Sequence, residues 1–161
     1  MKFLSRLLSL VVLAGLIGFY AGCDGNDPEK SPEQQQLEKI TSSWALQSAN
    51  SGTDRTQDFD GLVLTVSGSF VNEGGTYNYS FTGTRPNPSP WKENGTWKFG
   101  ANPTSEIIRD PGSDVELAMT YSVSETSLTI DFVIPSGYEC CPGSGRVSSV
   151  EGSWTFVFTK Q

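Results

Sequence analysis

The sequence predicts an all-β fold, an eight-stranded antiparallel up-and-down barrel preceded by one short helix. Eight segments after residue 41 alternate apolar and polar side chains with a period of two, which is typical of strands that place one face on a core. Short turn-forming segments separate several of these strands, so sequence neighbours are expected to pair as hairpins. Closing such a series into a barrel removes its exposed edges. A β-sandwich satisfies the same alternation and is the alternative.

The composition excludes several classes of protein. The 161 residues include 11 Lys or Arg, 18 Asp or Glu and no His, which gives a net charge of −7. Without His there is no Ser-His-Asp triad, no Cys-His pair and no His-bound metal. The acidic balance argues against a nucleic-acid partner, because neutralising phosphates requires clustered Lys and Arg. We therefore expect neither an enzyme nor a bound cofactor or metal.

The amino terminus predicts a lipoprotein signal peptide over residues 1–22. Lys2 and Arg6 supply the positive charge, and residues 7–17 are almost wholly apolar. The tripeptide Ala21-Gly22-Cys23 resembles a bacterial lipobox, which implies lipid attachment at Cys23. The apolar stretch is shorter than the ~20 residues of a membrane-spanning helix. Cleavage before Cys23 removes two basic residues and no acidic one, so the net charge becomes −9.

The residues that follow Cys23 divide into a tether and a folded domain. Residues 23–36 are predicted to form an acidic polar tether, and residues 37–161 the barrel. Within this stretch Ser31 can cap a helix, Pro32 suits its first position and Gln34 completes a capping box. The helix is expected to run to about Thr41.

The eight expected strands begin soon after this helix. They are Ser43–Ala49, Leu62–Gly68, Thr76–Gly83, Gly95–Gly100, Ser105–Arg109, Val115–Val123, Ser127–Pro135 and Gly152–Lys160. Three longer loops separate some of them, at residues 50–61, 84–94 and 136–151. Long loops on a rigid scaffold often carry binding function.

Short motifs along these strands give the chain a family resemblance. They are Ser42-Ser43-Trp44, Gly95-Thr96-Trp97-Lys98-Phe99, Ile107-Ile108-Arg109-Asp110 and Leu128-Thr129-Ile130-Asp131-Phe132. Together with the lipoprotein leader, they resemble the lipocalin-like domain of small Gram-negative envelope lipoproteins. The resemblance covers roughly residues 38–160. It implies an eight-stranded barrel with an apolar cavity and assigns no substrate.

Two further features are candidates for function. Cys140 and Cys141 are adjacent, and they could form a strained vicinal disulfide, stiffen a loop or stay unpaired. Asp54, Asp58 and Asp60 cluster in one loop, where they could hold Ca²⁺ or simply be solvated.

The aromatic residues are the candidate ligand contacts. Tyr77, Tyr79 and Phe81 share one strand face and could line a cavity, with Trp97 on the next strand. Trp91, in a Pro-rich loop, could stack on a sugar ring or plug one mouth of the barrel. An eight-stranded barrel is either filled by side chains or holds one small ligand.

These observations lead to two expected functions. The first is an envelope lipoprotein, held in the outer membrane by the acyl chains on Cys23, that binds a small apolar or amphipathic ligand or acts as an envelope accessory protein. The alternative is a surface module with a solid core that recognises glycan or protein through its loops. A monomer is expected in either case.

Overall fold

The computed structural model describes residues 29–138 and 150–161. Cys23, Cys140 and Cys141 lie outside these residues, as does the predicted signal peptide. Ser31–Gln161 is one compact unit. Among the described residues, no helix has both the length and the apolar character needed to cross a membrane.

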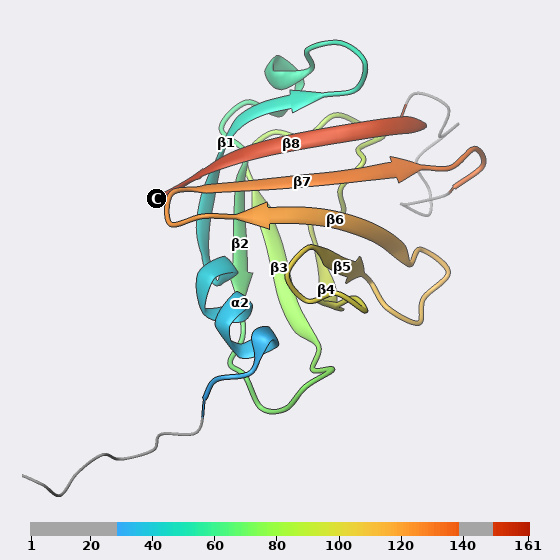
Figure 1. The fold of residues 1–161 in the computed structure, drawn as a ribbon. Coiled ribbons are helices and arrows are strands. Elements are labelled where there is room, and N and C mark those ends of the chain that lie inside the picture. The colour runs from blue at the N-terminus through green and yellow to red at the C-terminus, as the bar shows by residue number, and fades with distance from the viewer. Residues whose placement is uncertain (1–28, 139–149) are drawn as a thin grey trace, which may run out of the picture. The chain divides into compact units, whose positions relative to one another are not determined.

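The unit is a closed antiparallel barrel, as the sequence predicts, and not a sandwich (Figure 1). Each strand pairs with its sequence neighbour, and β1 pairs with β8 to close the ring. The strands are β1 (Ser42–Asn50), β2 (Val63–Ser67), β3 (Tyr77–Thr82), β4 (Asn94–Phe99), β5 (Glu106–Arg109), β6 (Leu117–Val123), β7 (Ser127–Ile134) and β8 (Gly152–Lys160). Every expected strand is confirmed, with ends that lie within two residues of the expected ones.

The helix α2 (Pro32–Ile40) closes one end of the barrel. The Ser31 hydroxyl accepts a hydrogen bond from the Gln34 amide at 3.2 Å, so the predicted cap is confirmed. Leu37 and Ile40 are buried on the barrel side, and the Trp44 indole N–H donates to the Ile40 carbonyl at 2.8 Å. The first residues of α2, which the sequence assigned to the tether, therefore belong to an element that is packed on the barrel.

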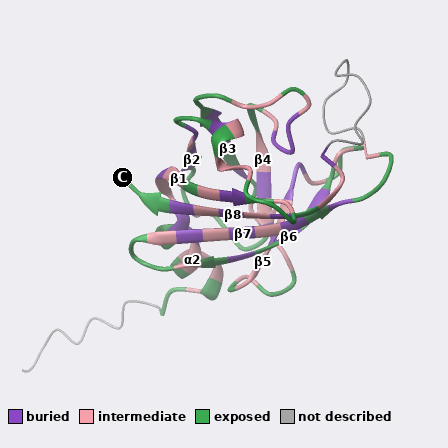
Figure 2. Ribbon diagram, turned by 90° about the horizontal axis from the view of Figure 1, so that it is seen from above, coloured by how far each residue is buried: buried purple, intermediate pink, exposed green. Residues whose placement is uncertain are grey.

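The buried residues alternate along the strands and face the barrel interior (Figure 2). Tyr77, Tyr79 and Phe81 are buried on β3, and Trp154, Phe156 and Phe158 on β8. Since the side-chain period of a strand is two, the sequence pattern had already assigned these residues to one face.

The connections sort into two sets at opposite ends of the barrel, because consecutive strands run in opposite directions. The end beside α2, which we call the helix mouth, carries the turns at residues 68–76, 100–105 and 124–126. The other end, which we call the loop mouth, carries residues 51–62, 83–93 and 110–116, and the described parts of the last connection, residues 135–138 and 150–151. Two of the long loops predicted from the sequence therefore belong to the loop mouth, and the third, at residues 136–151, begins and ends there.

Candidate functional site

The interior of the barrel is filled by side chains. The cavity at its centre measures about 30 Å³ and is lined by apolar and aromatic side chains that include Ile40, Trp91 and Ile130. A site for a small organic molecule usually has about 300–1,000 Å³. This cavity, lined by described residues, is therefore far too small for a fatty acid or a similar ligand.

Trp91 reaches this interior from the loop at residues 83–93, which we call the plug loop. Its indole is only 3% exposed. The ring centroid lies 4.9 Å from that of Phe81, 5.1 Å from that of Phe132 and 5.6 Å from that of Phe156. Of the two alternatives for Trp91, the structure places it as a plug within the core.

The other aromatic residues named from the sequence are equally buried. Tyr77, Tyr79, Phe81 and Trp97 are each at most 5% exposed. Tyr77 packs on Trp97 with the ring centroids 5.1 Å apart. Hydrogen-bond partners are absent among the described residues for the indole N–H groups of Trp91 and Trp97. The predicted ligand contacts thus meet as parts of one core.

Arg109 holds the plug loop in place, a role that the sequence analysis missed. Its side chain is 1% exposed on β5. One guanidinium nitrogen, Nη1, donates to the Pro90 carbonyl at 2.8 Å, and Nη2 donates to the Tyr138 hydroxyl at 3.0 Å. The guanidinium also lies 5.3 Å from the centroid of the Trp91 ring. The sequence did contain a signal for this burial. Because side chains alternate along a strand, Arg109 of β5 points to the same face as Ile107, which is the core face.

Asp110 provides a second connection to the plug loop. Its carboxylate lies 3.2 Å from the Lys92 ammonium and 3.8 Å from Nε of Arg109. It also accepts hydrogen bonds from the Thr96 amide at 3.1 Å and from the Tyr79 hydroxyl at 3.4 Å. Within the plug loop itself, Arg85 donates a hydrogen bond to the Trp91 carbonyl at 3.2 Å.

Gly95 gives this carboxylate its space. A Cβ at position 95 would lie 2.3 Å from Oδ1 of Asp110 and 2.6 Å from the Tyr79 hydroxyl. Such distances are far inside van der Waals contact, so only glycine allows Asp110 and Tyr79 to approach here. The glycine therefore serves the packing of the loop mouth.

We expect the stability of the fold to decrease above about pH 10 because of buried tyrosines. Burial raises the pKa of Tyr79 and Tyr121 well above the ordinary value of 10.0. The folded state thus retains protons that the unfolded state loses, so the stabilisation is complete below that value and is lost as the pH rises. For Tyr79 the loss reaches at most about 1.4 kcal/mol per pH unit.

Urea unfolding at about pH 8 and about pH 11 measures this effect. Tyr79→Phe should flatten the decline, because phenylalanine has no proton to lose. Ionisation of all tyrosines near pH 10 in the folded protein, followed by ultraviolet absorbance, would contradict the expectation.

The acidic residues at positions 54, 58 and 60 do not assemble into a cation site. Asp54 accepts hydrogen bonds from the amide and the hydroxyl of Thr56, and these bonds lower its pKa. Asp58 pairs with Arg55 at 2.5 Å. Over residues 29–138 and 150–161, no three His, Cys, Asp or Glu side chains group as metal ligands. In this region the carboxylates instead organise the loop locally.

No protein-family model, curated protein or solved structure matches this chain.

Proposed function

We propose that this protein is a lipid-anchored envelope module with a solid core that binds a partner protein through its loop mouth. The observation that carries the proposal is the filled interior, where about 30 Å³ remains empty. A barrel without an internal site must recognise partners with its surface. This is the alternative that the sequence left open, and the packing favours it.

The folded unit begins at the helix mouth, the end of the barrel opposite the loop mouth, because α2 leads directly into β1. Eight residues connect Cys23 to Ser31, and a fully extended chain of that length spans at most ~28 Å. A lipid on Cys23 would therefore keep the barrel close to the membrane and leave the loop mouth free to meet a partner.

The chemistry of the loop mouth favours protein over glycan as the partner. Sugar recognition typically uses an exposed aromatic face, yet all four tryptophans are buried. Tyr138 is only partly exposed, and its hydroxyl contacts Arg109 and the Val115 carbonyl. The exposed side chains of the described loops are mostly polar or charged, such as Thr53, Asp60 and Asp114. These groups fit the polar rim of a protein interface.

Site-specific photo-crosslinking in intact cells tests both parts of the proposal. A benzophenone side chain is placed at exposed Thr53 or Asp114 of the loop mouth, or at exposed Glu73 or Glu125 of the helix mouth. We expect a discrete protein adduct from the first pair and none from the second. The adduct should disappear with Cys23→Ala, which should also abolish labelling by an alkyne fatty acid.

Two results would overturn the proposal. Equal adducts from both mouths would show that the loops do not select the partner. Fatty-acid labelling that persists in Cys23→Ala would remove the anchor.

A second candidate function is binding of a small apolar ligand in the place of Trp91. The observation that favours it is that Trp91 belongs to no strand and that its loop is held to the barrel by the side chains of Lys92 and Arg109, so the ring could leave the core without breaking a strand pair. The indole N–H of Trp91 also has no hydrogen-bond partner in the described part of the chain, which makes burial of this ring less favourable. A lipid that stays bound to the full-length protein in native mass spectrometry would favour this candidate over a solid core.

A further inference from the structure

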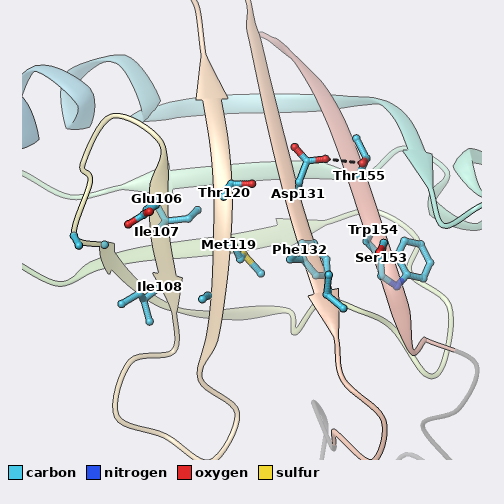
Figure 3. A pocket seen from close by; sticks show the side chains of 14 residues that line it. Glu106, Ile107, Ile108, Met119, Thr120, Asp131, Phe132, Ser153, Trp154 and Thr155 are labelled. Carbon is cyan, nitrogen blue, oxygen red and sulfur yellow. Dashed lines mark hydrogen bonds between the residues drawn. The ribbon is translucent and has the colours of Figure 1, made fainter.

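A trough crosses the outer face of the barrel over β5, β6, β7 and β8 (Figure 3). It encloses about 540 Å³, which is far larger than the interior cavity. Small residues explain the hollow, because Ala118 and Thr120 of β6 form its floor. Larger side chains rise on both sides, among them Ile108 on β5 and Val133 on β7.

The side chains of the trough form two parallel rows. Ile108 pairs with Ala118, and Val133 of the next strand is 58% exposed, which gives an apolar row. Glu106 pairs with Thr120, which pairs with Asp131, and this gives a polar row. Each residue of the polar row is two positions from its apolar counterpart, so the rows lie ~7 Å apart along the strands.

The polar row carries two carboxylates in fixed orientations. Oε2 of Glu106 accepts a hydrogen bond from the Asn102 amide at 3.0 Å, and Oδ1 of Asp131 accepts one from the Thr155 hydroxyl. The second oxygen of each carboxylate has no hydrogen bond or ion pair within the described part of the chain. These are the only formal charges among the residues that line the trough.

We infer that the trough binds an extended, cationic polypeptide segment in which Lys or Arg alternates with apolar residues. In an extended chain successive side chains point to opposite sides, so one side would carry cations to the polar row and the other apolar groups to Ile108, Ala118 and Val133. A second copy of this chain and the chain's own tether are less suitable occupants, because both are acidic like the trough. A second copy has a net charge of −7 or −9, and the tether contains Asp24, Asp27 and Glu29.

Fluorescence anisotropy of labelled hexapeptides on the full-length protein in neutral detergent tests the inference. The probe is (Lys-Leu)₃, with Lys-Lys-Lys-Leu-Leu-Leu as a control of equal composition and (Glu-Leu)₃ as a control of opposite charge. We expect (Lys-Leu)₃ to bind at least about tenfold more tightly than either control, since two ion pairs and an apolar contact sum to about that ratio.

Two double variants separate the trough from general electrostatics. Glu106→Gln/Asp131→Asn should weaken (Lys-Leu)₃ binding about tenfold. Glu73→Gln/Glu125→Gln removes the same net charge at exposed positions outside the trough and the loop mouth, and should leave binding within about twofold. Ala118→Trp fills the floor without changing charge and should abolish binding, while circular dichroism confirms that the barrel stays folded.

Three outcomes would overturn the inference. They are an equal loss in the two double variants, full binding by Ala118→Trp, or equal affinity for the two Lys-Leu peptides. Each would show that the trough does not bind a peptide through its alternating cationic and apolar side chains. None of these outcomes bears on the cross-links from the loop mouth, so the proposed function is tested separately.

Discussion

Arg109→Met is expected to lower the free energy of unfolding by about 3–5 kcal/mol, because it breaks a buried ion pair. Asp110 then keeps Lys92 as a cationic neighbour but loses Arg109. The variant also removes both hydrogen bonds that the guanidinium donates, to the Pro90 carbonyl and to the Tyr138 hydroxyl. Methionine fills much of the same volume, so the loss measures the polar contacts more than a cavity. Chemical denaturation followed by circular dichroism gives the value.

Two related variants check the physical cause. Arg109→Lys keeps the charge but loses the fork that bridges Pro90 and Tyr138, so it should fall between wild type and Arg109→Met. Arg109→Met/Asp110→Asn should recover part of the loss, because it removes the buried carboxylate that has lost one of its two neighbouring cations. A loss below about 1 kcal/mol in Arg109→Met would contradict the view that this residue ties the plug loop to the barrel.

Trp91→Ala is expected to cost about 3–5 kcal/mol of folding stability, which is the range for emptying a large aromatic site in a core. The indole contacts the rings of Phe81, Phe132 and Phe156, and none of these can fill the space without leaving its own position. If Trp91 were an exposed side chain that served only to bind sugar, its replacement by alanine would change the folding stability little. Denaturation curves recorded by circular dichroism distinguish the two cases.

Trp91→Phe is the matched control for this variant. It keeps a ring in the core and removes an indole N–H that has no partner among the described residues, so it should cost less than half as much as Trp91→Ala. The Trp91→Ala barrel should also gain thermal stability from added indole, whereas the wild type should not. Equal stability of wild type and Trp91→Ala would place Trp91 outside the core.

The strand pattern and the helix start were readable in the sequence because they depend on local chemistry. A period of two assigns Tyr77, Tyr79 and Phe81 to one face wherever that face lies. Ser31 and Pro32 mark a helix start through their own hydrogen bonding and fixed backbone angle. Short turns between strands favour hairpins, and eight strands joined in consecutive hairpins favour closure.

The burial of Arg109 and the location of Trp91 could not be read in the same way. The charge of Arg109 argues for the surface, and only its neighbours in space, Pro90, Tyr138 and Asp110, make burial tolerable. Trp91 lies in a loop, where no period assigns a face. Both depend on contacts between segments far apart in the sequence.

The sequence alone thus determined the strands and the capped helix, and it favoured an all-β barrel over a sandwich. Whether that barrel is hollow or solid was decided only by its tertiary structure. The alternation of apolar and polar residues predicts which side chains point inward. The volume left between these side chains depends on how they pack against one another across the barrel. Here the plug loop adds Trp91 to the inward rows, and together they leave about 30 Å³.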